Sequence, residues 1–426
     1  MVYKMGDEVL RCRPFSYAFK EKNRDKICDY CFSSRQAKIL RCSRCCIIYY
    51  CGRQCQRLSW SEIHKKECKY LKMLDLKEPP LDLLFIVRTL CKLKYDGGYS
   101  KEVSLPNGRS RKFIDLMSHK ENILMNPEHK KRFLTYLDII IYMLGGSLET
   151  NESEVLNIFT KLMINASFML NEKLIDFGGC LCLEFSAIDH SCRPNAIYMF
   201  NGHTLVVKAL CEIANFDDVR VAYVDMSQPR SIRQELLKNQ FFFDCNCEEC
   251  AEDPLNLEKL KSHSPCCPEC QHLLDGTKCM NCNQEVDLAR YYQIKEILIK
   301  EKKVNAKTSL YFKEVCKYFH SFDYVSLKYC NELIAIHRSN YNENELQIIF
   351  ERILLAKRKY GCFYDIFTAE CLMLLMMILL NKEELKSLPN LLLETKTVID
   401  LIYPRSHSIF HEFNDVNLMF QMIKNK

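Results

Sequence analysis

Eight candidate metal ligands between positions 28 and 68 constrain the fold of this 426-residue chain more than any other feature. They are seven cysteines and one histidine, arranged as four pairs. A structural zinc ion prefers four tetrahedral thiolate or imidazole ligands, and a two-residue gap lets one tight turn direct two sulfurs at the same ion. Eight ligands therefore predict two zinc sites. In chain order the ligands are Cys28, Cys31, Cys42, Cys45, Cys51, Cys55, His64 and Cys68.

Two pairings of these ligands are compatible with the spacing. A sequential arrangement would join neighbouring pairs, whereas a cross-brace would join alternate pairs. In the cross-brace, one ion is bound by Cys28, Cys31, Cys51 and Cys55, and the other by Cys42, Cys45, His64 and Cys68.

Two further cysteine clusters predict two more zinc ions, which makes four in total. Cys245, Cys247 and Cys250 provide three thiolates, one fewer than a closed structural site needs, and Cys192 is the candidate fourth ligand. Two CxxC knuckles separated by eight residues then indicate a zinc ribbon that closes on one ion. The ribbon ligands are Cys267, Cys270, Cys279 and Cys282.

The paired spacing of the 26 cysteines favours zinc in a reducing compartment over a disulfide scaffold. Residues 1–19 contain no basic-then-apolar run with a small-residue cleavage site, so no signal peptide is expected. The longest apolar run, residues 372–380, is too short to cross a bilayer and is expected to form a buried helix. The nucleus and the cytoplasm both fit these features, and no membrane association is expected.

The charge of the chain is close to balanced. Sixty basic and 54 acidic residues give a net charge of +6. This small excess supports an acidic partner only weakly, and direct nucleic-acid binding is expected to be weak or absent.

The remaining sequence pattern predicts a chain of mixed α and β structure. Apolar residues at helical spacing follow Pro79 and Pro80 and continue to about Leu170, most clearly over 81–93 and 133–144. Short β-type runs follow at 196–200, 204–209 and 219–224. From Asp287 to the end helix follows helix, with spacing that suggests helix-pair repeats of the tetratricopeptide kind.

Two groups of motifs resemble known domains. The four ligand pairs, with Trp60 and the basic helix that ends at Cys68, resemble a MYND finger, a family that uses the cross-brace. The run from Asp189 to Asn195 (Asp-His-Ser-Cys-Arg-Pro-Asn), the strand that ends at Tyr223 and the CxCxxC cluster at 245–250 resemble a SET domain. Together they resemble the SET-and-MYND family of protein-lysine methyltransferases.

This resemblance implies an α+β fold in which a MYND zinc finger is inserted within a split SET domain. The implied parts are an N-terminal SET remnant (1–25), the MYND finger (26–72), a helical insert (73–170) and the core SET domain (171–244). A zinc-bound post-SET cluster with the zinc ribbon (245–286) and a C-terminal α-helical, tetratricopeptide-like domain (287–426) follow.

The resemblance also implies an activity, which is methyl transfer from S-adenosylmethionine to a lysine amine of a histone or another protein. It places the hydroxyl of Tyr223 at the point of transfer. It further implies that proline-rich peptides bind to the MYND finger. The residues that it places around the cofactor are Asp189, His190, Asn165, His119 and Phe243.

Four positions depart from the family pattern. The family's Gly-x-Gly turn has no counterpart from Met1 onward, Asp189 replaces an asparagine, Phe241 replaces a tyrosine and Ser167 replaces an aromatic residue. Two alternatives therefore stay open. One is a methyltransferase with altered selectivity, or with a true start upstream of Met1, and the other is a catalytically weakened scaffold that recruits protein partners.

Overall fold

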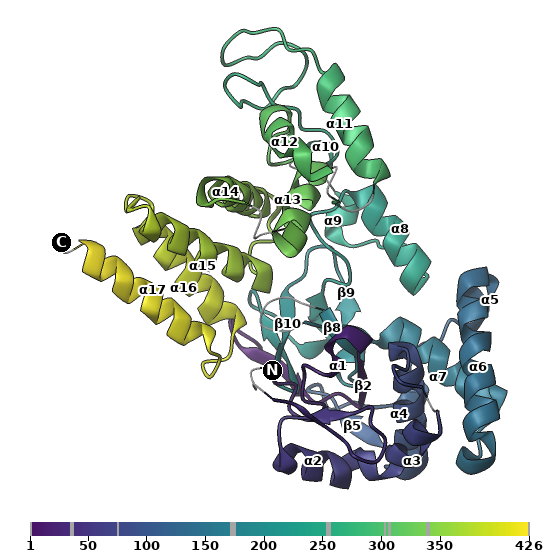
Figure 1. The fold of residues 1–426 in the computed structure, drawn as a ribbon. Helices are drawn as coiled ribbons and strands as arrows, with labels where there is room; N and C mark the ends of the chain where they lie inside the picture. Colours follow the sequence, from purple (N-terminus) through teal and green to yellow (C-terminus); the bar gives the residue numbers. More distant parts are fainter. Residues whose placement is uncertain are drawn as a thin grey trace. The chain divides into compact units, whose positions relative to one another are not determined.

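The computed structural model of this chain describes residues 2–34, 38–74, 76–170, 176–252, 257–301, 304–305, 308–337 and 341–424. It divides the chain into two compact units, whose elements are labelled in Figure 1. The first unit comprises residues 1–190, 194–221 and 240–242, and the second comprises residues 191–193, 222–239 and 243–426.

The first unit contains twelve short strands among its described residues. They form small sheets, in the orders β1-β11-β10, β2-β8-β7, β12-β9, β3-β4 and β5-β6. The strands are β1 (Glu8–Cys12), β2 (Ser16–Phe19), β3 (Leu40–Arg41), β4 (Tyr49–Tyr50), β5 (Glu102–Ser104), β6 (Ser110–Lys112), β7 (Ser167–Leu170), β8 (Asp176–Leu181), β9 (Asp189–His190), β10 (Ala196–Asn201), β11 (Thr204–Ala209) and β12 (Arg220–Val221).

The helices of the first unit lie between its early and late strands in the sequence. They are α1 (Glu21–Arg24), α2 (Arg53–Ser59), a π-helical turn η1 (Trp60–His64), α3 (Lys65–Met73), α4 (Leu81–Tyr95), α5 (Lys120–Met125), α6 (Pro127–Leu148) and α7 (Glu152–Asn165). The helical periodicity over 81–93 and 133–144 thus corresponds to α4 and α6, which confirms both predictions.

Strand pairing shows that the sheets are split in the sequence. β1 pairs antiparallel with β11, and β2 pairs antiparallel with β8, with Ser16 opposite Leu181 and Phe19 opposite Gly178. The finger and the helical insert lie in the sequence between these partners. The structure therefore confirms the α+β fold with an inserted finger.

The finger and the helical insert share one hydrophobic core. Cys28 and Cys68 of the finger belong to the same buried cluster as Leu83 and Leu90 of α4 and Phe159 of α7. Helix α4 also packs on β2, where the Thr89 hydroxyl donates to the Ser16 hydroxyl at 2.7 Å. The finger is therefore packed into the first unit and is not a separate domain.

The second unit is helical apart from its metal clusters. Its helices are α8 (Arg230–Phe241, whose last two residues are assigned to the first unit), α9 (Glu248–Ala251), α10 (Leu257–Ser262), α11 (Ala289–Lys300), α12 (Phe312–Tyr318), α13 (Tyr324–His337), α14 (Glu343–Tyr360), α15 (Ile366–Asn381), α16 (Leu388–Ile402) and α17 (Ile409–Lys424).

Local sequence signals explain the boundaries of the C-terminal helices. Asn342 and Glu345 form a reciprocal capping box at the start of α14, and Gly361 ends that helix at a positive φ of 68°. Asp365 then caps α15 by accepting from the Thr368 amide at 2.7 Å. Helix α15, which contains the predicted buried run, packs against α14, α16 and α17. The helical tail thus has the predicted class.

One predicted strand is shorter than its sequence pattern. Residues 219–224 alternate like a strand, yet only Arg220 and Val221 are paired. Their partner β9 is itself only two residues long, and a turn capped by Asn215 ends immediately before Val219. The pattern was right about strand type and wrong about length because it cannot report how long the partner strand is.

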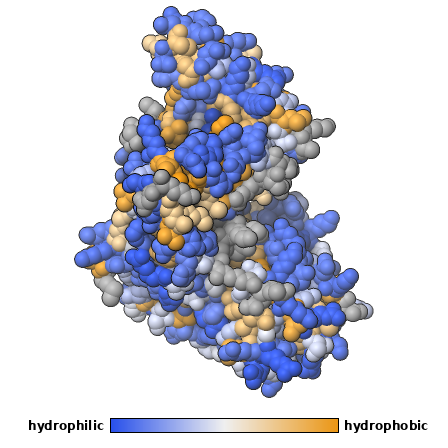
Figure 2. Space-filling model, turned by 60° about the vertical axis from the view of Figure 1, so that its left-hand side comes forward, coloured by the Kyte–Doolittle hydropathy of each residue, from blue (hydrophilic) through white to orange (hydrophobic). Residues whose placement is uncertain are grey.

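Two further observations concern the apolar residues of the chain. No helix in the described part of the chain is both long and apolar enough to cross a membrane. On the face drawn in Figure 2, hydrophilic residues predominate and apolar residues lie between them.

Gly178 in β8 lies closer to its neighbours than a larger residue would allow. A β-carbon there would collide with the carbonyl oxygen of Ala18 and lie 2.7 Å from Met169 Cε. At the neighbouring Gly179 the closest atom, in the ring of Phe85, would be an ordinary 3.4 Å away. We expect Gly178→Ala to destabilise the chain by about 1–3 kcal/mol, as overpacking typically does. Denaturant unfolding measures this, and Gly179→Ala, as the matched control, should stay close to the wild type. Equal unfolding midpoints for the two variants would contradict this packing.

Candidate functional site

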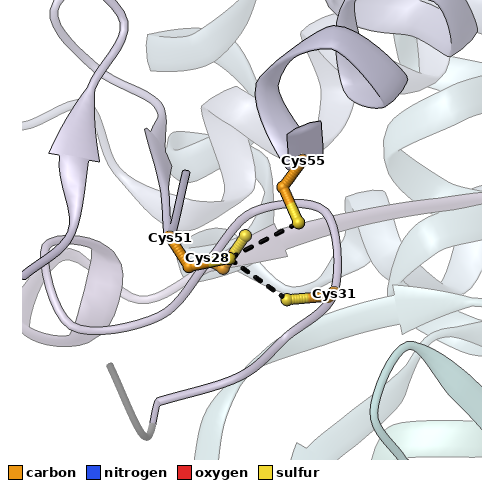
Figure 3. Close-up of side chains that lie close together, drawn as sticks. All are labelled: Cys28, Cys31, Cys51 and Cys55. Carbon is orange, nitrogen blue, oxygen red and sulfur yellow. Dashed lines mark hydrogen bonds between the residues drawn. The ribbon is translucent and has the colours of Figure 1, made fainter. Parts of the chain in front are cut away.

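The first metal cluster consists of Cys28, Cys31, Cys51 and Cys55. Figure 3 shows their side chains pointing toward one another from the knuckle at 28–31, from the chain before α2 and from α2 itself. The sulfurs of Cys31 and Cys51 lie 3.8 Å apart and those of Cys51 and Cys55 lie 3.4 Å apart. Cys28 is buried, and the other three are half-buried.

The second cluster consists of Cys42, Cys45, His64 and Cys68, all of which are buried. The sulfurs of Cys42 and Cys68 lie 3.9 Å apart, and His64 Nε2 lies 3.7 Å from Cys45 Sγ. His64 comes from the π-helical turn η1, whose wider winding precedes α3. Together the two clusters have the alternate pairing of a cross-brace, which spacing alone had left open.

The third and fourth clusters lie in the second unit. In the third, Cys192 Sγ lies 3.6 Å from Cys250 Sγ, and the Cys192 amide donates to Cys247 Sγ at 3.4 Å. In the fourth, the sulfur separations are 3.6 Å for Cys267 and Cys282, 3.5 Å for Cys270 and Cys279, and 3.6 Å for Cys270 and Cys282. The two full sets are Cys192, Cys245, Cys247 and Cys250, and Cys267, Cys270, Cys279 and Cys282.

These separations fit a tetrahedral metal site. Four sulfurs placed ~2.3 Å from one zinc ion lie ~3.8 Å from each other. In all four clusters, the ligand atoms lie within 4.8 Å of one another. The donor sets, which are thiolates with at most one imidazole, are those that zinc prefers over harder ions. The geometry thus brings together every metal ligand that the sequence predicted.

A buried charge network lies between the first two clusters. Arg88 of α4 donates to both oxygens of Glu67, at 2.8 and 2.7 Å, and to both oxygens of Asp29, at 3.2 and 2.9 Å. Glu67 Oε1 accepts in turn from His64 Nδ1 at 3.0 Å. Because Nε2 of His64 faces the metal ligands, this hydrogen bond fixes the ring tautomer that can bind zinc. Asp29 directly follows the zinc ligand Cys28 in the sequence.

The network includes four ionisable side chains that are almost fully buried. Burial raises the pKa of Asp29 to about 6, against the attraction of Arg88. Burial alone would also raise the pKa of Glu67, but Arg88 and His64 reverse that effect and lower it. A single guanidinium is thus shared by two carboxylates, one beside each metal cluster. Each group depends on the others, because an unpaired buried charge is costly.

The third cluster also has a buried arginine beside it. Arg233 of α8 is fully buried and donates from Nε to Cys192 Sγ at 3.3 Å. The next residue, Gln234, exchanges two hydrogen bonds with the backbone of Cys245, at 2.7 and 2.9 Å. A zinc ion with four thiolates carries excess negative charge, so a guanidinium at this distance stabilises it. Helix α8 therefore holds both ends of the third site.

The residues expected at the cofactor are distributed over both units. Asp189 and His190 form β9, where they lie opposite Arg220 and Val221 of β12 in a parallel pair. Asn195 holds this arrangement: its side chain accepts from the Arg220 amide at 2.7 Å and donates to the Asp218 carbonyl at 2.8 Å.

Asn165 and His119 lie close to the same loop of the first unit. Asn165, the last residue of α7, donates to the Met117 carbonyl at 2.8 Å. His119 precedes α5 with a positive φ of 41°, and its ring centre lies 5.3 Å from that of Phe242. Tyr223 and Phe243 belong to the second unit, and their placement beside the other four residues stays a prediction.

The sequence analysis missed several residues that the structure places at these sites. Glu67 and Arg88 looked like ordinary charged positions on helices, and Asp29 looked like a knuckle residue. The spacing of Glu67, three residues after His64 on one helical surface, is the signal that could have found it. Arg233 and Phe242 gave no comparable signal.

The finger has a counterpart among known protein families. Residues 28–68 match the family model of the MYND finger. The chain therefore contains a zinc finger of the MYND class, in the place where the first two clusters lie.

Curated proteins then match the chain well beyond the finger. It is 28% identical over 275 residues to the human histone-lysine N-methyltransferase SMYD3, an alignment that covers 63% of this chain and 62% of the human protein. It is 26% identical to the histone-lysine N-methyltransferase ASHR1 of Arabidopsis thaliana, over 66% of this chain and 55% of that protein. These alignments span less than two thirds of either relative.

A longer alignment joins the chain to the N-lysine methyltransferase SMYD2-A of Xenopus laevis, with 25% identity over 369 residues. It covers 81% of this chain and 83% of that protein. The comparisons confirm the resemblance that the motifs indicated. The chain is a divergent relative of the SET-and-MYND family.

Replacing Arg88 should damage the finger and its metal together. We expect Arg88→Met to cost about 3–5 kcal/mol, because Glu67 and Asp29 would stay buried without their cation. It should also speed zinc loss from the second cluster to a competing chelator, because His64 loses its orienting partner. Denaturant unfolding and zinc-release kinetics measure the two effects. The matched control is Lys92→Met, which removes another buried cation one turn further along α4. Wild-type zinc kinetics in Arg88→Met would contradict this role.

Cys192 and Cys180 are both buried cysteines, yet only Cys192 belongs to a metal cluster. The wild-type chain should contain four zinc ions by elemental analysis, and Cys192→Ala should contain three. Cys192→Ala should also unfold the region around 245–250 at lower temperature than Cys180→Ala, because a three-thiolate site binds zinc less tightly. Equal thermal stability and equal zinc content in the two variants would exclude the third site.

Proposed function

We propose that this chain is a protein-lysine N-methyltransferase that uses S-adenosylmethionine. The observation that carries the proposal is the parallel pair of β9 and β12, held by Asn195. Tyr223 follows β12 by two residues, and two residues of extended chain span at most ~7 Å. Covalent continuity therefore limits how far the proposed catalytic tyrosine can lie from Val221, the residue that pairs with His190.

The exposed carboxylate of Asp189 suits the amino-acid end of this cofactor. Ionised aspartate is an acceptor only, and the ammonium of the cofactor is a donor, so the substitution of asparagine preserves one productive contact. By the resemblance, His190, Asn165, His119 and Phe243 would hold the rest of the cofactor. The bound cofactor supplies an electrophilic methyl group on a sulfonium.

The chain's own residues would then align and prepare the lysine. A protonated amine has no lone pair, so an apolar channel that lowers the lysine pKa is needed before transfer. The transfer is an in-line displacement, in which alignment of amine, methyl and sulfur supplies much of the rate acceleration. We assign this alignment to the hydroxyl of Tyr223, which would accept from the amine and contact the methyl group.

The substrate would be a lysine of a histone or of another protein, and proline-rich segments of partners would bind to the MYND finger. We expect the protein in the nucleus and the cytoplasm. Three substitutions relative to the family motifs, at Asp189, Phe241 and Ser167, favour the competing candidate, a weakened scaffold that recruits partners through the finger and the helical tail. Affinity for S-adenosylmethionine separates the two candidates, because only the enzyme needs it.

Tyr223→Phe should abolish methyl transfer without unfolding the chain. Loss of one hydroxyl should change stability by no more than about 1 kcal/mol. Loss of a contact made in the transition state should reduce the rate by roughly 10²–10³. The measurements are thermal unfolding and transfer of radiolabelled methyl to mixed histones and to cell lysate. Tyr292→Phe, which removes an exposed hydroxyl on α11, is the matched control.

Calorimetry of S-adenosylmethionine binding completes this test, on this chain and on an N-terminally extended one. If neither binds the cofactor or transfers methyl, the scaffold candidate replaces the enzyme. If the wild type is active and Tyr223→Phe is equally active, the methyltransferase stands but the assignment of its central residue fails.

A further inference from the structure

The four metal clusters differ in how far their ligands are exposed to solvent. All four ligands of the second cluster are buried, and three of four are buried in the third. In the ribbon, Cys282 is exposed and Cys270 is half-buried. The ribbon is therefore the cluster whose thiolates a small reagent in solution reaches most directly.

The ribbon also has the least protein packed around it. Its own hydrophobic cluster has four buried members, Cys267, Leu274, Cys279 and Val286, two of which are metal ligands. Its sequence neighbours 275–278 and 280–285 are exposed. The second cluster, in contrast, lies in the large core of the first unit and is held by Arg88 and Glu67. Displacing the ribbon metal therefore disturbs less of a hydrophobic core than displacing the metal of the second cluster would.

The exposed thiolate already has partners for a disulfide. Cys282 Sγ lies 3.6 Å from the sulfurs of both Cys267 and Cys270. A disulfide needs ~2.05 Å, so the sulfurs must approach each other by about 1.5 Å once the ion no longer separates them. Cys46 and Cys211 are exposed too, but they belong to none of the four clusters and no metal holds a second thiolate beside them.

We propose that the ribbon is an oxidation site for hydroperoxides, at which disulfide formation releases the zinc ion. Zinc-bound sulfur has thiolate character, and thiolate character with exposure decides which cysteines are oxidised first. The reagent class is hydrogen peroxide or a small organic hydroperoxide.

The first step is attack by Cys282 Sγ on one peroxide oxygen. The S–O bond forms, the O–O bond breaks, and the departing hydroxide takes a proton from solvent to become water. In the second step the sulfur of Cys267 or Cys270 attacks Cys282 Sγ. The S–S bond forms, the S–O bond breaks, and the second hydroxide also becomes water.

In sum, two thiolates, one hydrogen peroxide and two protons give one disulfide and two waters, with two electrons passing from sulfur to peroxide. The metal then keeps only two thiolate ligands and dissociates as Zn²⁺. A thiol reductant reverses the disulfide by exchange, so the site can be reloaded.

Loss of the ribbon metal would be felt at the end of α12. The Cys266 amide donates to the Tyr318 carbonyl at 2.9 Å. The Lys317 carbonyl accepts from Cys266 Sγ at 3.4 Å and from Gln271 Nε2 at 3.3 Å. These bonds depend on the backbone course that the first knuckle gives to residues 266–271. Oxidation should therefore raise hydrogen exchange in α12 and the turn that follows it.

The test is a titration of the full zinc-loaded chain with hydrogen peroxide. Free zinc is measured with a metallochromic indicator, and oxidised cysteines are mapped by sequential alkylation and peptide mass spectrometry. We expect one zinc ion per chain to be released at roughly tenfold lower peroxide than the other three. A disulfide within 267–282 should accompany that release. Oxidation of finger or third-cluster cysteines at the same dose would overturn the proposal, as would ribbon zinc that persists until all four ions leave.

Two pairs of substitutions sharpen this result. Cys270→Ser with Cys282→Ser should contain three zinc ions and lack the sensitive phase. Cys46→Ser with Cys211→Ser removes two exposed thiols outside the clusters and should keep that phase unchanged. The proposal fails if the sensitive phase disappears in the second pair and survives in the first. That result would assign the oxidation to Cys46 or Cys211 and not to the ribbon. Peptide mapping of the wild type decides the matter even if the first pair fails to fold.

Discussion

The first unit depends on one buried guanidinium. Arg88 pairs with Glu67 and Asp29, each of which is next in the sequence to a metal ligand of the finger. Arg88 is almost fully buried, so water does not replace these partners. The next residue of α4, Thr89, donates to Ser16 in β2. The finger ligands, the insert helix and the N-terminal strand are therefore fixed relative to each other by adjacent residues of one helix. This explains how a finger can interrupt a split domain in sequence without forming a separate body.

The metal clusters solve a related problem of chain connectivity. The two finger clusters and the third cluster each join segments that lie apart in the sequence. In the third cluster, more than fifty residues separate Cys192 from Cys245. Such sites need charge compensation from the surroundings, and buried arginines supply it: Arg88 acts through Glu67 at the second cluster, and Arg233 contacts Cys192 directly. The ribbon closes over a short loop and stays near solvent. The difference in exposure thus follows from what each metal has to hold together.

Much of the fold and of the metal ligation could be predicted from the sequence, for physical reasons. Zinc ligands are restricted to few residue types at fixed spacings, and helices such as α4 and α6 can be predicted from the periodicity of their apolar residues. Partnerships between charged groups are different, because nothing in the sequence distinguishes Arg88 and Glu67 from charged residues on a solvated helix face. Strand length was also hidden, since β12 ends where its partner β9 ends. Phe242, whose ring lies beside that of His119, gave no signal in the sequence because ring neighbours depend on the fold.

Under the proposed function, the loop from Asp189 to Asn195 would influence selectivity for a methyl acceptor. The loop from Asp189 to Asn195 is bound at its two ends by different forces: β9 pairs with β12 at one end, and Asn195 bonds to the backbone of Asp218 and Arg220 at the other. Between these ends lies Cys192, a ligand of the third cluster. Only two residues of chain separate Cys192 from Asn195. The side chain of Asp189 is exposed, so the substitution there changes the local charge while the backbone of β9 still pairs with β12. The backbone pairing of β9 and the charge at position 189 can thus vary independently.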